Sequence, residues 1–233
     1  MDSQDQTVTN TSHRLHNWFK THRFLFLLIT IMLLFVIHPL TQGLVRINFI
    51  LDIFLSAILL SAIYAVGQKR PALIFALFTV LPASFAHWIY WFVKIPILHL
   101  IDVSFTMVFL AFATFTIVQH LFRQKRVTAD LIRGAVCGYF LMGLMWASAY
   151  AFLEALTPGS FDSGSAHALD TNDLIYFSFV TLCTVGYGDI IPLTNQARML
   201  SVLEAVMGQM YIAVNIAALV AIRISQSTDK SST

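Results

Sequence analysis

Charged residues are scarce in this sequence of 233 residues: Asp, Glu, Lys and Arg make up 11% of it, and 58% of its residues are hydrophobic. Soluble domains carry about a quarter charged residues, so this composition excludes an ordinary soluble protein. Cysteine is also rare. Cys137 and Cys183 both lie in apolar stretches, which argues against a disulfide framework or a cysteine-based metal site.

Signals for processing and for catalysis are missing too. No small-residue cleavage site follows the first apolar stretch, so we expect no removable signal peptide. No two histidines within one apolar stretch have the spacing of a metal-ligand pair, so a membrane-embedded metalloenzyme has no support. The net charge is only +2. We therefore expect neither an enzyme nor a partner of nucleic acids.

Long apolar stretches occupy most of the chain. Stretches of about 18 residues or more are typical of membrane-spanning helices, and six are predicted, at 24–40, 45–66, 71–93, 97–122, 131–156 and 197–224. A polar loop (157–172) and a short apolar stretch (174–183) separate the last two. This stretch is too short to cross a bilayer and suits a re-entrant helix. The predicted fold is an all-α membrane protein.

The distribution of Lys and Arg predicts the orientation, because both accumulate on the cytoplasmic side. With the N-terminus inside, eleven of the fourteen fall in cytoplasmic segments and three outside. The external three are Arg46, Lys94 and Arg198. Four parts follow: a cytoplasmic N-terminal segment (1–23), a four-helix membrane part (24–126), a second membrane part (127–224) and a short cytoplasmic tail (225–233), which leaves no room for a soluble regulatory domain. The acidic loop 157–173 then faces outward.

One motif carries chemistry: Thr184-Val185-Gly186-Tyr187-Gly188-Asp189. Backbone carbonyls can replace the hydration shell of a cation when successive residues point them at one axis. That arrangement needs alternating right- and left-handed backbone conformations, which glycine adopts at little cost. Gly186 and Gly188 have this alternating spacing. Thr184 offers a carbonyl and a hydroxyl for the innermost ring of ligands.

Residues 181–189 resemble the signature of the potassium channel superfamily, and the similarity continues through Pro192, Arg198 and Gly208 over residues 131–224. The resemblance implies a potassium-selective channel in which 127–224 is the pore domain. K⁺ would bind the backbone carbonyls of Thr184, Val185, Gly186 and Tyr187, helped by the Thr184 hydroxyl, and no other cofactor is implied. The expected filter residues are Thr184, Val185, Gly186, Tyr187 and Gly188. One filter segment per chain requires a homotetramer.

The resemblance also implies residues that support the filter. They are Asp189, Tyr176, Phe177, Thr181 and Glu204. Tyr187 is expected to pack on Tyr176 and Phe177 of its own or a neighbouring subunit, and Glu204 to brace the short helix.

The sequence departs from the superfamily's pattern at two positions beside the filter. Cys183 stands where threonine is usual, and Val180 stands where some relatives carry a glutamate that pairs with the aspartate after the filter. That pairing cannot occur here, so the inactivation behaviour of those relatives cannot be transferred. The short helix is still expected to aim its negative dipole end at a central cavity.

A gate is predicted in the last span. Gly208 matches the hinge glycine of related inner helices. Below it, apolar residues recur every four positions and so share one helix face. They are Ile212, Ile216, Val220 and Ile224. In the superfamily's register this row faces the pore and could block ions by excluding water. The alternative is that the row packs against the fifth span.

The first four spans contain no voltage sensor of the usual kind, because stretch 97–122 has no Arg or Lys. Asp52 and Asp102 lie inside spans, where they are either functional groups or partners of nearby polar residues. Arg123, Lys125 and Arg126 are consecutive basic residues at a membrane boundary and are expected to touch anionic lipid.

We predict passive, weakly voltage-dependent K⁺ conduction, with both termini cytoplasmic and a bacterial inner membrane as the expected location. Two alternatives remain open: the membrane subunit of a K⁺ uptake transporter, and a non-conducting receptor or structural subunit. Transporters usually carry several less complete filter loops per chain, unlike the single complete motif here. The sequence does not indicate the gating stimulus.

Overall fold

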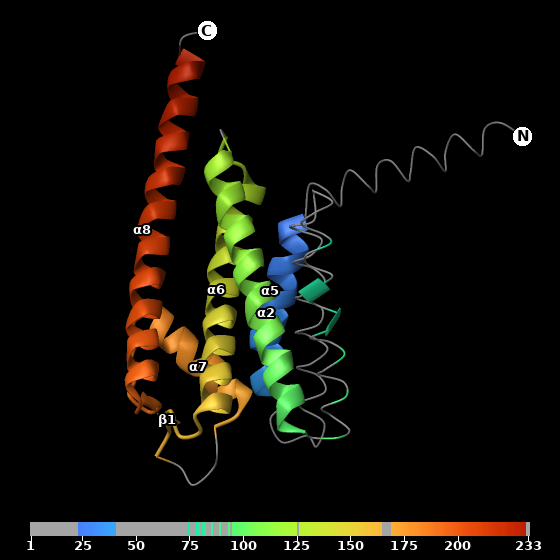
Figure 1. The fold of residues 1–233 in the computed structure, drawn as a ribbon. Coiled ribbons are helices and arrows are strands. Elements are labelled where there is room, and N and C mark those ends of the chain that lie inside the picture. The colour runs from blue at the N-terminus through green and yellow to red at the C-terminus, as the bar shows by residue number, and fades with distance from the viewer. Residues whose placement is uncertain are drawn as a thin grey trace, which may run out of the picture.

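The computed structural model describes residues 23–40, 95–124, 126–164 and 169–231, with isolated residues between 74 and 93 (Figure 1). Two two-residue strands, β1 (Phe161–Asp162) and β2 (Ile191–Pro192), accompany the helices. The helices are α2 (Arg23–Leu40), α5 (Pro96–Arg123), α6 (Ala129–Leu156), α7 (Thr171–Leu182) and α8 (Asn195–Ser231).

Three of these helices are long and apolar enough to cross a membrane: Ile97–Arg123, Ala129–Leu156 and Asn195–Ile224. A shorter apolar helix covers Phe24–Val36. These helices coincide with the predicted spans at 97–122, 131–156, 197–224 and 24–40. The predicted spans at 45–66 and 71–93 lie outside the described residues, apart from isolated positions in the second, and so does Asp52.

The helices begin where the sequence supplies capping groups. Pro96 opens α5, where a missing N–H costs nothing. The Thr128 side chain accepts a hydrogen bond from Leu131 N at 3.2 Å and caps α6. Asp170 accepts from Asp173 N at 3.0 Å while Asp173 accepts from Asp170 N at 3.0 Å, a reciprocal cap for α7. Local sequence therefore starts the short helix where the acidic loop ends.

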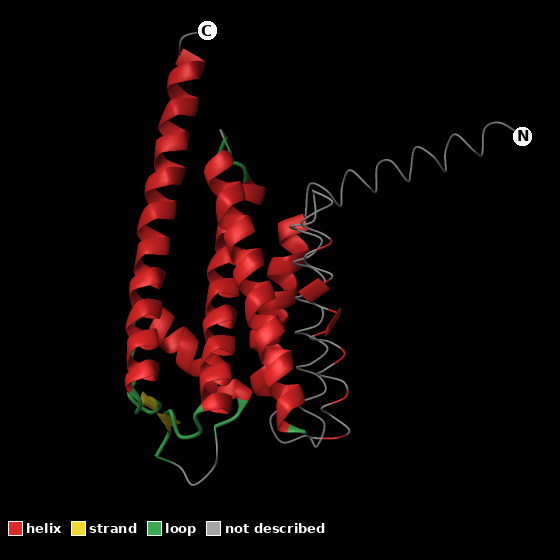
Figure 2. Cartoon of the chain, viewed as in Figure 1, coloured by secondary structure: helices red, strands yellow, loops and turns green. Residues whose placement is uncertain are grey.

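The long helices run side by side, and α7 lies across them near one end (Figures 1 and 2). One apolar cluster joins α2, α5 and α6 and includes Phe24, Ile31, Ile117 and Leu141. A second apolar cluster, which includes Tyr150, Phe161 and Phe177, surrounds α7. Close contact between helices is helped by Gly143, where an added Cβ would lie 2.6 Å from the Phe179 ring. The second cluster fixes α7 against α6.

The two strands depart from the all-α prediction, because they form a short antiparallel pair with Phe161 opposite Pro192. Leu193 N donates to Ser160 O at 2.8 Å. On the same side, the Glu154 carboxylate accepts from the backbone N–H groups of Gly159, Ser160 and Phe161 at 2.6, 2.9 and 3.2 Å. The segment before α7 and the segment after residue 189 are therefore tied together at the end of α6.

Candidate functional site

The backbone after α7 alternates in handedness. Thr184, Gly186 and Gly188 have φ values of 56°, 58° and 80°, whereas Val185 and Tyr187 between them keep negative φ. Gly186 and Gly188 adopt the left-handed conformations predicted from their spacing. Thr184 adopts one as well, which the sequence did not predict. Alternation of this kind turns successive carbonyls toward the same side of the chain.

Hydrogen bonds hold the start of this segment against the end of α7. Thr184 N donates to Thr181 O at 2.9 Å, and Val180 O accepts from Val185 N at 2.9 Å and from Gly186 N at 3.4 Å. Thr181 and Val180 thus contribute their backbone carbonyls here. Within the described part of the chain, no hydrogen bond reaches the carbonyls of residues 184–187. Those oxygens remain available to a ligand.

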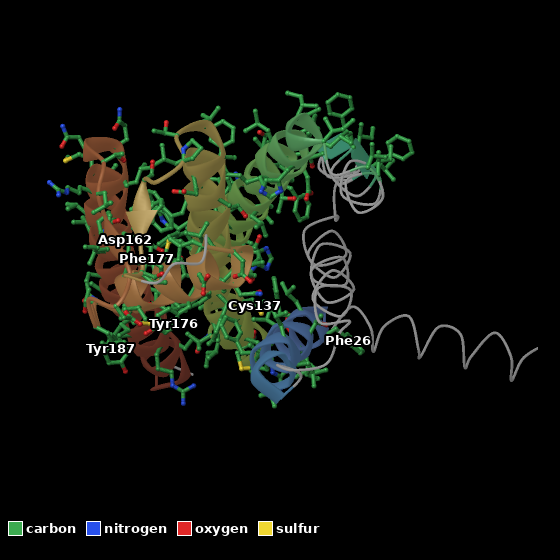
Figure 3. All side chains as sticks on the ribbon, turned by 90° about the horizontal axis from the view of Figure 1, so that it is seen from below. Phe26, Cys137, Asp162, Tyr176, Phe177 and Tyr187 are labelled. Carbon is green, nitrogen blue, oxygen red and sulfur yellow. The ribbon has the colours of Figure 1, made fainter. Side chains whose placement is uncertain are left out.

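The whole segment 183–189 is exposed on the single chain. Figure 3 shows Tyr176 and Tyr187 on the same side of the molecule, with Phe177 set back toward Asp162. Tyr187 is 72% exposed, whereas Phe177 is 6% exposed. The Phe177 ring lies edge-on to Tyr150 and Phe161, at centroid distances of 5.1 and 5.3 Å. Within one chain, Phe177 therefore anchors α7 to α6 and β1.

Asp189 is bonded to the short helix through Tyr176. The Tyr176 hydroxyl donates to Asp189 Oδ2 at 2.7 Å. This hydrogen bond lowers the pKa of Asp189 and raises the pKa of Tyr176 to about 12. Tyr176 thus provides a hydrogen-bond partner for Asp189, which the apolar side chain of Val180 cannot do.

A polar contact from α6 meets the junction between α7 and this segment. The Tyr139 hydroxyl donates to Leu182 O at 3.3 Å and lies 3.6 Å from Cys183 Sγ. Gly208 of α8 approaches the same carbonyl, because an added Cβ would lie 2.6 Å from Leu182 O. Close approach gives a reason for glycine at 208 that does not depend on bending. The helices α6 and α8 therefore both contact the last turn of α7.

A family model described as "Ion channel" matches residues 135–224. The match covers α7, the alternating segment and most of α6 and α8. The chain is also similar to "Two pore potassium channel c" of Oryza sativa subsp. japonica, with 33% identity over 81 residues, 35% of this chain and 18% of that protein. The chain thus matches about a fifth of that relative's length. The two similarities liken residues 135–224 to ion channels and support the resemblance to the potassium channel superfamily.

The predicted gate row lies on the open face of α8. Ile212, Ile216, Val220 and Ile224 are 39%, 58%, 52% and 60% exposed on the single chain. A neighbouring face of α8 carries Tyr211 and Asn215, and Tyr211 donates to Ala135 O of α6 at 2.6 Å. Contact with α6 is made by that second face, while the side chains of the predicted row are exposed on the single chain.

Glu204 is fully buried where α6, α7 and α8 meet, at 0% exposure. It bonds to the hydroxyl groups of Tyr150 and Ser178. Sequence reasoning placed Glu204 against the short helix but missed Tyr150, Ser178 and Tyr139. Their signal was present, since each places a polar group within an apolar stretch, where it requires a partner.

The remaining predicted residues lie away from this segment. Thr106 donates to Asp102 Oδ1 at 3.4 Å one turn along α5. Arg123 and Arg126 are exposed beside the end of α5, and Lys125 lies outside the described residues. Among the described residues, no group of His, Cys, Asp and Glu could hold a metal ion.

Proposed function

We propose that this chain is one subunit of a homotetrameric, potassium-selective channel with six membrane spans and cytoplasmic termini. The alternating backbone at Thr184, Gly186 and Gly188, at the end of a short helix between two apolar spans, is the observation that carries the proposal. Four such segments around an axis would surround K⁺ with the carbonyls of residues 184–187 and the Thr184 hydroxyl.

The exposure of this segment supports assembly from several copies. A segment that is open on the single chain, next to an α8 that is mostly unburied, requires neighbours to complete its surroundings. In a tetramer, Tyr187 would find packing partners in an adjacent subunit. The absence of Lys and Arg from Ile97–Arg123, apart from its final residue, supports conduction that depends little on voltage.

The basic residues support the orientation. The C-terminal end of α5, which finishes at Arg123, and the C-terminal end of α8 lie at the end of the molecule opposite to β1 (Figure 1). Cytoplasmic placement of the basic end would satisfy the positive-inside rule, with Arg123 and Arg126 against anionic lipid and Asp189 at the external mouth.

The test is a recording of the purified protein in lipid bilayers with mixed K⁺ and Na⁺. We expect reversal potentials that follow K⁺ and an open probability that changes little with voltage. Gly186→Ala should abolish current, because a methyl group opposes the left-handed backbone. Gly164→Ala is the matched control: its φ is also positive, at 66°, and neither glycine has a neighbour within 4 Å of an added Cβ. Equal permeability to Na⁺ in the wild type contradicts the proposal.

A further inference from the structure

Three short oxygen–oxygen contacts surround the buried Glu204 carboxyl, but the two hydroxyl groups that take part in them carry only two hydrogens. Tyr150 Oη contacts Glu204 Oε2. Ser178 Oγ lies 2.5 Å from Glu204 Oε1 and 2.7 Å from Gly143 O. Three short contacts of this kind need three hydrogens, because two acceptors without a hydrogen between them repel.

An ionised carboxylate cannot supply the third hydrogen. Tyr150 and Ser178 carry one hydroxyl hydrogen each, and a carboxylate and a carbonyl only accept. The nearby Ser201 hydroxyl donates to Ala197 O of its own helix at 2.9 Å. A protonated carboxyl group adds the missing hydrogen, and each of the three contacts then contains one.

Burial agrees with this count. Glu204, Ser178 and Tyr150 are all 0% exposed. In the described part of the chain the recorded partners of the Glu204 carboxyl are hydroxyl groups, with no Lys or Arg among them. An ionised carboxylate in such surroundings is costly without a cation.

We propose that Glu204 is a neutral carboxylic acid that positions α7. Its O–H donates to Ser178 Oγ, the Ser178 O–H donates to Gly143 O, and Tyr150 donates to the other carboxyl oxygen. One chain of hydrogen bonds then runs from α8 through α7 to α6. Ser178 lies on the short helix that ends at the filter segment, so this connection fixes the helix against both long helices.

Glu154 provides a matched control with the opposite requirement. Its two carboxylate oxygens accept three hydrogen bonds from backbone N–H groups, so both oxygens of this side chain must be acceptors. Glutamine retains one acceptor and replaces the other with an NH₂ donor. Glu204→Gln should therefore be tolerated, because its amide can donate to Ser178 and accept from Tyr150. Glu154→Gln should not be tolerated.

The experiment measures thermal denaturation and infrared absorption of the purified full-length protein at neutral pH. Glu204→Gln should shift the midpoint by less than about 2 °C, whereas Glu204→Ala and Glu154→Gln should lower it by about 5 °C or more. The wild type minus Glu204→Gln spectrum should contain the C=O stretch of a protonated carboxylic acid. A missing band, or a Glu204→Gln midpoint as low as that of Glu204→Ala, overturns the proposal.

A second variant keeps the test decisive if Glu204→Gln does not fold. Ser178→Ala removes the acceptor of the Glu204 hydrogen, so the protonated-acid band should move to higher frequency. An unchanged band contradicts the proposal. None of these readouts requires ion flow, so a negative result is distinguishable from a failure of the chain to conduct K⁺.

Discussion

The helices α6 and α8 are both apolar enough to span a membrane, yet they differ in how much of each the chain itself covers. Within the single chain, 56% of the spanning window of α6 is buried, against 11% of that of α8. Their mean hydropathies, 1.5 and 1.9, do not explain this difference. The positions of the two helices explain it, because α6 lies between other elements, whereas α8 extends past it toward the C-terminus (Figure 1).

The two faces of α8 show what the difference means. Its buried side carries polar residues, with Glu204 at 0% and Asn215 at 8% exposure, while Val206, Met210 and Ile216 are 50%, 59% and 58% exposed. A helix in water would have the reverse arrangement. Since such a face gains nothing from contact with water, the surroundings of α8 must be lipid or further copies of the chain.

The largest effect is expected from a charge on the open face of α8. Val206→Lys should reduce the proposed tetramer to smaller species, because it places an ionised side chain on the face where further copies are proposed to pack, and a buried charge without a partner is costly. Ile132→Lys on α6, where Ile132 is 48% exposed, is the control and should leave assembly intact. Native mass spectrometry of both variants gives the answer, and equal loss of tetramer would show that the two helices do not differ.

A smaller effect is expected where α8 touches its own chain. Gly208→Ala places a methyl group against Leu182 O and should cost about 1–3 kcal/mol. The control is Gly134→Ala on α6, where the nearest atom to the added Cβ is on the Phe24 ring at 3.3 Å, a milder approach than the 2.6 Å at Gly208. Denaturation midpoints in detergent should fall for Gly208→Ala and change little for Gly134→Ala. A tolerated Gly208→Ala would contradict the close approach.

The predicted gate row should affect current more than stability. Val220→Asn would wet a ring of apolar side chains and raise basal current, since water exclusion depends on an apolar lining. Val214→Asn, at a position 44% exposed outside this row, should change it less. Bilayer recordings compare the two variants. If Val220→Asn behaves like the wild type while substitutions at residues 184–188 alter open probability, the gate would lie in the proposed filter instead.

The smallest effect is expected from Tyr176→Phe, which removes the hydrogen bond to exposed Asp189. That bond lowers the pKa of Asp189, so it favours folding above the ordinary carboxyl pKa and is lost as pH falls through the lowered value. In the variant the pKa of Asp189 should rise. A carboxyl titration followed by nuclear magnetic resonance measures the shift, and an unchanged pKa would mean that Tyr176 does not hold the aspartate.

The sequence alone was sufficient for features set by local chemistry. Apolar length predicted the helices α5, α6 and α8 to within a few residues at most of their ends, and α8 continued further, to Ser231. Glycine spacing predicted the left-handed backbone at Gly186 and Gly188. Each of these properties is decided within a few residues of the position concerned.

Features set by contacts across the chain were not predictable. Phe177 and Tyr176 are neighbours in sequence, yet the Phe177 ring packs against Tyr150 while the Tyr176 hydroxyl donates to Asp189. The sequence matched Gly208 to a hinge glycine, but its close approach to Leu182 depends on how α7 packs against α8 and could not be predicted. The β1–β2 pair likewise depends on Phe161 and Pro192 meeting across 30 intervening positions.

Among the described residues, Thr184 is the one amino acid other than glycine with a positive φ. A left-handed conformation costs an L-residue roughly 1–2 kcal/mol, so Thr184→Gly should relieve strain and make the chain more stable. It would also delete the hydroxyl at the inner end of the segment. Selection for thermal resistance alone would therefore favour glycine at 184, and a stability-driven redesign of this protein should keep that position fixed.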